Sequence, residues 1–140
     1  MEGEKKKILI VDDDSFLLDM YAFKFSQNNF EVYTVMEGGQ AIEKLEGGLS
    51  PDVVLMDLIM PGMDGFETLE KIRDNKLCPS ATKIILSNKS QQADIDRGAA
   101  LGVEGYIVKA NSTPAEVIEQ VIKILSKKIT PPTATLNQNQ

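Results

Sequence analysis

Short apolar runs rich in β-branched residues recur five times along the chain, and each is followed by a longer stretch of mixed polar and apolar residues. The runs lie at positions 8–11, 31–35, 53–56, 83–86 and 106–108. Their length and composition are typical of β-strands. The first, third and fourth lack polar alternation, which predicts strands covered on both faces of a parallel sheet. Because such strands are joined by right-handed helical crossovers, the chain is predicted to fold as an α/β (βα)5 sandwich.

The stretches that follow these runs are predicted to be helices, at positions 15–28, 40–46, 64–75, 91–101 and 113–125. Asp14, Asp64 and Ser90 are placed to begin or cap three of them, because a short polar side chain before the first turn can accept a backbone N–H. The last helix has the clearest start, since Thr113-Pro-Ala-Glu116 forms a capping box with proline at the first helical position. Its apolar residues form one stripe, which predicts packing against the sheet.

The size of the chain limits it to one domain of ordinary dimensions. It has 140 residues, of which 42% are hydrophobic and 26% are charged. We expect this domain to span 5–129. Residues 130–140 carry no charge and little to bury, which predicts a flexible tail or linker stub. No apolar run is long enough to cross a bilayer or to act as a secretory signal, so we expect no membrane association.

Composition excludes several classes of function. Fifteen Lys and Arg against 21 Asp and Glu give a net charge of −6, which argues against direct binding to nucleic acid. The single cysteine, Cys78, excludes an internal disulfide and suits the cytoplasm. The absence of histidine excludes Ser-His-Asp and Cys-His catalysis and imidazole metal sites. The remaining chemistry has to use carboxylates, hydroxyls, lysines and a hard cation.

Acidic residues follow two of the predicted strands. Asp12 and Asp13 come directly after the first strand, and Asp57 comes directly after the third. Ser87 ends the fourth strand and Lys109 follows the fifth. The carboxyl ends of parallel strands share one edge of the sheet, where α/β proteins bind ligands. We therefore expect these side chains to face one crevice.

The charge of this set predicts a bound cation. Asp12, Asp13 and Asp57 carry three negative charges against the one positive charge of Lys109, which leaves a net charge of −2. Carboxylates crowded in this way have raised pKa values unless a cation joins them. All the available ligands are oxygens, which favours magnesium, manganese or calcium over zinc or copper. We expect Mg²⁺, with Mn²⁺ as the alternative.

Four segments now form an ordered set: Val11-Asp-Asp-Asp14, Met56-Asp-Leu-Ile-Met-Pro-Gly-Met-Asp-Gly65, Ser87 and Lys109. In this order and at these intervals the set resembles the receiver domain of two-component response regulators. The resemblance covers about 5–129. It implies a doubly wound, flavodoxin-like fold with strand order 2-1-3-4-5, and a phosphoacceptor signalling module rather than an enzyme.

The resemblance also implies residue roles. Asp57 would attack a phosphohistidine on a sensor histidine kinase or phosphotransfer protein and become an acyl phosphate. Asp13 and Asp57 would ligate the cation directly and Asp12 through water, while the backbone carbonyl of Ile59 would supply a further ligand. Lys109 would contact the phosphoryl oxygens. This agrees with the general requirement of phosphoryl transfer for positioning and charge neutralisation.

A conformational switch follows from the same resemblance. Ser87 would move to hydrogen-bond the phosphoryl group, and Tyr106 would turn inward behind it. The face formed by the fourth helix, fifth strand and fifth helix would thereby change shape. We expect that face to bind a second copy of the chain or an effector.

The chain departs from the family pattern in two places. Ala110 stands where the family usually has proline, often after a cis bond. A non-proline cis bond costs roughly 2.5 to 4 kcal/mol, so we expect a trans bond here. Asn88 stands where a small alanine is common and is expected to narrow access to the phosphoryl group. Its neighbour Lys89 is expected to attract the phosphoryl oxygens or to pair with Asp12.

Three other functions fit parts of the pattern. A small aspartyl-phosphate phosphatase would also use aspartate with magnesium, but that family carries its Asp-x-Asp nucleophile on the first strand. A flavodoxin-like flavin binder needs a phosphate loop after the first strand, where three aspartates would repel a phosphate. A pseudo-receiver that is never phosphorylated would not need the full set of acids.

Overall fold

Five parallel strands form one sheet in the computed structural model, which describes residues 4–128. The strand order is β2-β1-β3-β4-β5. The strands are β1 (Lys6–Val11), β2 (Phe30–Val35), β3 (Val53–Met56), β4 (Thr82–Ser87) and β5 (Gly105–Val108). The predicted doubly wound sheet and its order 2-1-3-4-5 are therefore confirmed. The predicted tail at 130–140 lies outside the described residues.

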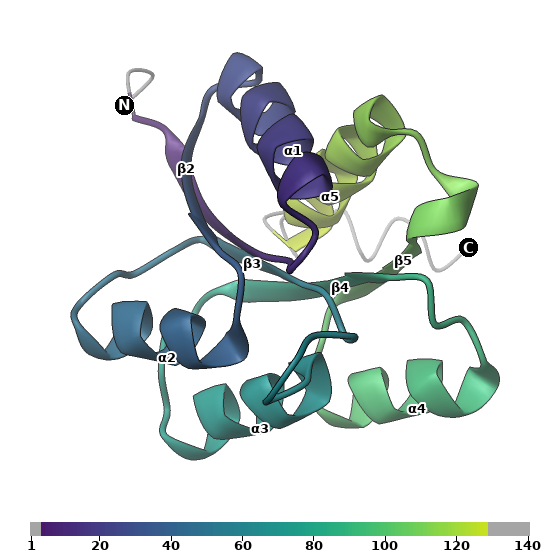
Figure 1. Cartoon of the computed structure of the whole chain (residues 1–140). Coiled ribbons are helices and arrows are strands. Elements are labelled where there is room, and N and C mark those ends of the chain that lie inside the picture. Colours follow the sequence, from purple (N-terminus) through teal and green to yellow (C-terminus); the bar gives the residue numbers. More distant parts are fainter. Residues whose placement is uncertain (1–3, 129–140) are drawn as a thin grey trace, which may run out of the picture.

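Helices cover both faces of this sheet. They are α1 (Ser15–Gln27), α2 (Gly38–Glu46), α3 (Gly65–Asp74), α4 (Gln92–Ala100) and α5 (Pro114–Lys128). Figure 1 shows α1 and α5 on one face and α2, α3 and α4 on the other. Between positions 4 and 128, none of the helices is both long and apolar enough to cross a membrane.

Two hydrophobic cores lie on the two faces of the sheet. Ile8 and Ile10 of β1 belong to the core under α1 and α5, whereas Leu9 and Val11 belong to the core on the opposite side. Successive side chains of a strand point to opposite faces, so a strand that serves two cores has to be apolar at every position. This explains why the central strands lack polar alternation.

Side-chain caps fix several helix starts where the sequence placed them. Asp14 accepts a hydrogen bond from the Leu17 backbone N–H at 3.1 Å. Thr113 and Glu116 exchange the two hydrogen bonds of the predicted capping box. A cap of this kind satisfies backbone donors that have no partner within the helix. The helix starts at α1 and α5 are thus confirmed.

Two helix starts were predicted wrongly. Ser90 does not cap α4, because the chain is still extended at Gln91, which is the residue before the helix and makes no side-chain cap. Ser90 therefore lies one residue too early. The second helix begins at Gly38 instead of Gln40. Gly38 fits there because a Cβ atom would lie 2.1 Å from the Thr68 hydroxyl of α3.

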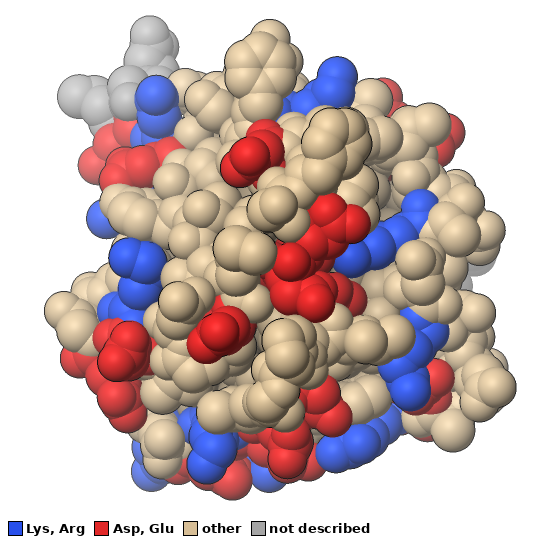
Figure 2. Space-filling view, viewed as in Figure 1, with Lys and Arg blue, Asp and Glu red and all other residues tan. Residues whose placement is uncertain are grey.

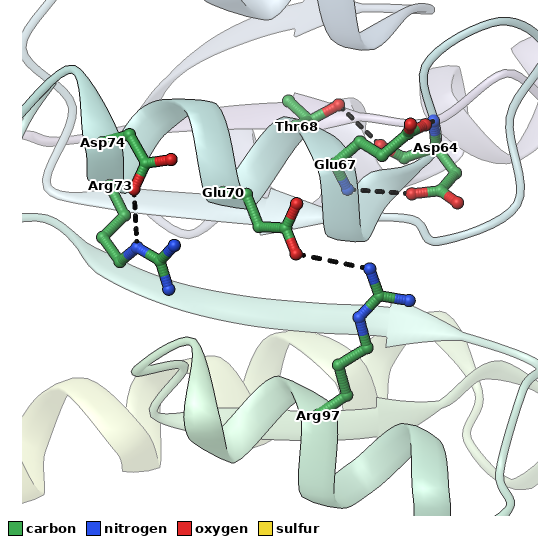
Figure 3. A network of polar contacts seen from close by, with 7 residues as sticks. All are labelled: Asp64, Glu67, Thr68, Glu70, Arg73, Asp74 and Arg97. Atoms are coloured by element: carbon green, nitrogen blue, oxygen red, sulfur yellow. Dashed lines mark hydrogen bonds and ion pairs between the residues drawn. The ribbon is translucent and has the colours of Figure 1, made fainter.

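A network of exposed polar contacts lies along α3 and α4 (Figure 3). Asp64 and Glu67 form the capping box that opens α3. Arg97 of α4 pairs with Glu70 at 3.3 Å, and its guanidinium carbon lies 4.3 Å from the centre of the Phe66 ring. We call Asp64, Glu67, Glu70, Arg73, Asp74 and Arg97 the α3–α4 network.

Candidate functional site

The carboxyl ends of β1 and β3 bring aspartates together. The two strands pair in register with Val11 opposite Met56, so the residues that follow them lie side by side. The Asp57 backbone N–H donates to the Val11 carbonyl at 2.9 Å, which holds the acidic residue against β1. Carboxylate oxygens of Asp12, Asp13 and Asp57 lie within 4.8 Å of one another. The predicted cluster of acids is therefore present.

Lys109 joins this cluster from the end of β5. Its ammonium Nζ lies 2.8 Å from Asp12 Oδ2 and 3.4 Å from Asp57 Oδ2, and its side chain is only 10% exposed. Acidic side chains gather near the centre of the face drawn in Figure 2, with basic side chains beside them. We call Asp12, Asp13, Asp57 and Lys109 the acid pocket.

Burial and charge oppose each other at the acid pocket. Asp12 is 1% exposed and Asp57 is 6% exposed. Burial raises the pKa of Asp57; the Lys109 charge acts against this rise, and the Asp12 charge adds to it. Burial by itself would lower the pKa of Lys109, but its hydrogen bonds and charge interactions with the two carboxylates raise it overall. Lys109 is thus held as an ammonium, whereas ionisation of Asp57 has a cost.

The carboxylates of the acid pocket are a group of residues that could hold a metal ion. Asp12 Oδ1 accepts the Asp14 backbone N–H at 2.9 Å, and Asp57 Oδ1 accepts the Ile59 backbone N–H at 3.4 Å. Asp13 is exposed at the surface of the pocket. The donors are all carboxylate oxygens and the acid pocket keeps a net charge of −2. This donor set fits a hard divalent cation.

The three other predicted residues, Ser87, Tyr106 and Ile59, make contacts of their own. Ser87 ends β4, is fully buried, and its hydroxyl accepts the Lys89 backbone N–H at 3.3 Å. The Tyr106 hydroxyl donates to the Lys89 carbonyl at 2.6 Å. Ile59 follows Asp57 by two residues and is 59% exposed. The roles of Ser87, Tyr106 and Ile59 toward a phosphoryl group or cation stay predictions.

The residues that depart from the family pattern contact one another. Asn88 Oδ1 accepts the Ala110 backbone N–H at 2.8 Å, and the described residues contain no cis peptide bond. The bulk of Asn88, from which a narrowed access was predicted, gives no indication of this bond. The sequence did contain a signal for this bond: Asn88, after the fourth strand, carries an acceptor side chain, and Ala110, after the fifth, has the backbone N–H that proline would lack. Lys89 forms an ion pair with Asp94 at 3.8 Å, and the ion-pair partner of Asp12 is Lys109. The alternative in which Lys89 pairs with Asp12 was therefore wrong.

Gly65 is a second residue that the sequence analysis undervalued. A Cβ atom at this position would lie 2.2 Å from the Asp57 carbonyl oxygen and 2.8 Å from the Leu58 Cα. The Gly65 backbone N–H also donates to the Leu58 carbonyl at 3.0 Å. Glycine therefore allows the start of α3 to approach the backbone of Asp57, and this close approach helps to fix the acidic loop.

Comparisons with known proteins agree with this geometry. The model of the response regulator receiver domain family matches residues 8–122. The chain is 29% identical over 136 residues to the alkaline phosphatase synthesis transcriptional regulatory protein PhoP of Bacillus subtilis, covering 96% of the chain and 55% of that protein. The chain thus spans about half the length of this curated relative.

Two solved structures are similar over their whole length. One is a CheY-like response regulator receiver domain protein of Methanospirillum hungatei, with 27% identity and a TM-score of 0.79 over 89% of this chain and 96% of that one. The other is a chemotaxis protein of Vibrio cholerae, with 25% identity and a TM-score of 0.79 over 86% of this chain and 99% of that one. Together with the acid pocket, the family match shows that this chain belongs to the response regulator receiver domains, the phosphoacceptor modules of two-component signalling.

Proposed function

We propose that Asp57 accepts a phosphoryl group from a phosphohistidine of a sensor histidine kinase or phosphotransfer protein. A carboxylate oxygen of Asp57 forms a bond to phosphorus while the bond from phosphorus to the donor nitrogen breaks. The product is an acyl phosphate on the receiver and a neutral histidine on the donor. Carboxylates are known covalent acceptors, and this reaction depends mainly on positioning and charge neutralisation.

The observation that carries this proposal is the contact of Lys109 with Asp57 and Asp12 inside a cluster of three acids. Asp57 is held from the β1 side by its backbone and contacted by the ammonium from the β5 side. A phosphoryl group that arrives at Asp57 would meet the ammonium at once. Preorganised charge of this kind favours the transfer because it needs no rearrangement during the reaction.

The acid pocket is also proposed to hold Mg²⁺, with Mn²⁺ as a substitute. Asp13 and Asp57 would bind the ion directly, Asp12 through water, and the Ile59 backbone carbonyl would add a further oxygen. Bound magnesium supplies positive charge that offsets the phosphoryl oxygens. The oxygen donors and the net charge of −2 support this choice.

The signal is proposed to leave through the face formed by α4, β5 and α5. Ser87 would exchange its contact with the Lys89 N–H for one with the phosphoryl group, and Tyr106 would leave the Lys89 carbonyl and turn inward. Both contacts meet in the loop before α4, which supports a coupled change. A second copy or an effector would bind this face. We place the module in the cytoplasm, without direct contact to nucleic acid.

The proposed function is tested by replacing Asp57 with Asn and incubating the protein with acetyl phosphate and magnesium. Intact mass should show one added phosphoryl group on the wild-type chain and none on Asp57→Asn. Asp14→Asn is the matched control, because Asp14 lies in the neighbouring loop and Asn is an equally good helix cap. Equal labelling of Asp57→Asn and wild type would show that another residue is the acceptor.

A further inference from the structure

One side-chain hydrogen bond joins the loop after β4 to the loop after β5. Asn88 Oδ1 accepts the Ala110 backbone N–H at 2.8 Å across 22 residues of sequence. Within the sheet, Ser87 is the register partner of Val108. Asn88 and Lys109 are the next residues on these two strands, so the bond continues the β4–β5 connection just beyond the last backbone pair.

The bond supplies a partner that the local backbone does not provide. Lys109 begins a short 3-10 turn, 109–111, and the first N–H groups of a helical turn have no acceptor within it. Val108, which precedes the turn, makes no side-chain cap. Asn88 supplies the acceptor from another strand. Only a residue other than proline at position 110 can donate this bond, because proline has no backbone N–H.

The position of this bond matters for Lys109, whose side chain has four rotatable bonds between the backbone and the ammonium. The residue before it is held by β5 and the residue after it is held by Asn88. With both flanks fixed, the ammonium reaches Asp12 at 2.8 Å and Asp57 at 3.4 Å. Small displacements of a reacting or charge-neutralising group cost much of its effect on a reaction rate.

We propose that Asn88 is a positioning residue for Lys109, which fixes the turn at 109–111 and thereby keeps the ammonium aimed at Asp57 for phosphoryl transfer. This inference rests on the proposed function of the acid pocket. It assigns Asn88 a role through its acceptor oxygen rather than through its bulk.

The test uses Asn88→Leu, which keeps a side chain of similar size but removes the acceptor. Its rate of phosphorylation by acetyl phosphate at saturating magnesium should fall about fivefold, the factor that corresponds to a net hydrogen bond of about 1 kcal/mol. Magnesium affinity should stay unchanged, because Asp12, Asp13 and Asp57 are intact. The proposal would be overturned if Asn88→Leu were phosphorylated at the wild-type rate, or if its magnesium affinity fell by the same factor as its rate.

A second variant removes the donor instead of the acceptor. Ala110→Pro should slow phosphorylation to a similar extent, and Asn88→Leu combined with Ala110→Pro should be no slower than the slower single variant. Losses that multiply in the double variant would show two independent effects and would overturn the proposal. Because Ala110→Pro can disturb folding, the result with Asn88→Leu is decisive by itself.

A third comparison shows whether Asn88 acts through Lys109. In a Lys109→Met background, Asn88→Leu should change the phosphorylation rate by less than a factor of two, since there is no ammonium left to position. A full fivefold loss in that background would contradict the proposal. Failure of the proposed function gives a different result, in which wild type is not labelled at Asp57 at all.

Discussion

The acid pocket and the α3–α4 network both consist of acidic and basic side chains in contact, but they differ in burial. In the pocket, Asp12 and Asp57 are almost fully buried and share one ammonium. In the network, the side chains of Glu70 and Arg97 are 40% and 49% exposed and form a one-to-one pair. Water therefore screens the charges of the network far more than those of Asp12, Asp57 and Lys109, which are buried; of the acid pocket only Asp13 is exposed.

This difference separates charges that serve the fold from charges that serve a reaction. Exposed pairs contribute little to stability, because water already solvates both partners. Buried charges lose their hydration, and the attraction between them often does not recover that loss. A pocket with more acids than bases, such as this one, therefore destabilises the fold. Such a pocket is what the proposed phosphoryl transfer and cation binding require, and stability does not account for it.

The largest effect is expected from Lys109→Met in metal-free buffer. It removes the one cation within hydrogen-bonding distance of Asp12 and Asp57 among the described residues. Breaking a buried charge pair in this way costs about 3 to 5 kcal/mol of unfolding free energy. Urea denaturation measures this loss. Added magnesium should restore more stability to Lys109→Met than to wild type, because two uncompensated carboxylates attract the ion.

Lys123→Met is the control for this variant, because Lys123 is exposed on α5. Its unfolding free energy should stay within about 0.5 kcal/mol of wild type. A similarly small change in Lys109→Met would mean that the pocket charges are well solvated, and the contrast between the two regions would disappear.

A smaller effect, of opposite sign, is expected from Asp57→Asn. Burial raises the pKa of Asp57 above its ordinary value of 3.8, so ionisation of this group weakens the folded state. The cost is absent at pH values below 3.8 and appears as the pH rises through the folded-state pKa. The variant should therefore be more stable than wild type at neutral pH in EDTA, and this advantage should shrink on acidification.

Urea denaturation at several pH values measures the advantage of Asp57→Asn. Asp14→Asn again serves as the control, since Asp14 is exposed and is not part of the acid pocket. If Asp57→Asn were less stable than wild type at neutral pH, attraction by Lys109 would outweigh the cost of burial.

The helix cap in the α3–α4 network should have a moderate effect. Asp64→Ala removes the acceptor for the Glu67 backbone N–H and should cost about 1 kcal/mol of unfolding free energy. Asp64→Ser keeps a capping oxygen and should lose much less. Magnesium affinity should be the same in both variants, because Asp64 is not part of the acid pocket. A lower magnesium affinity in Asp64→Ala would show that the α3–α4 network and the acid pocket are energetically coupled.

The smallest effect should come from the ion pair between α3 and α4. A double-mutant cycle of Glu70→Gln and Arg97→Gln should give a coupling free energy of about 0.2 to 1 kcal/mol that falls with added salt. Arg97→Gln should lower the unfolding free energy more than Glu70→Gln, because it also removes the contact between the guanidinium and the Phe66 ring. A coupling as large as the effect of Lys109→Met would remove the distinction between exposed and buried charges.

Local signals in the sequence predicted most of the fold. The apolar runs predicted the five strands. In β1, β3 and β4 the runs lack polar alternation because these strands lie inside the sheet, between two helical layers, and are covered on both faces. Asp14, Asp64 and Thr113 predicted helix starts, because a cap acts within a few residues of itself. The start of α4 was predicted one residue too early. Ser90 is a typical capping residue, but the chain stays extended through Gln91, and no local signal in the sequence indicates that extra extended residue.

The acids of the candidate site could also be predicted, since all three lie within two residues of the end of a strand. The strand order came from the resemblance to a family, because alternation of strands and helices is compatible with several orders. That order brings Asp12 and Asp57 side by side. The roles proposed for Ser87 and Tyr106 depend on how loops move, which a sequence pattern does not encode, and the role proposed for Ile59 stays a prediction.

By itself, the sequence determined the order of the strands and helices along the chain, the caps of α1, α3 and α5, and the strand ends that carry the acids, the hydroxyl and the ammonium. The tertiary structure decided which of these groups meet. It placed Lys109 on both Asp12 and Asp57, and the Asn88 side chain on the backbone of Ala110. The physical reason is that periodicity and capping act over a few residues, whereas these contacts join strands that are distant in the chain and require ångström-scale complementarity.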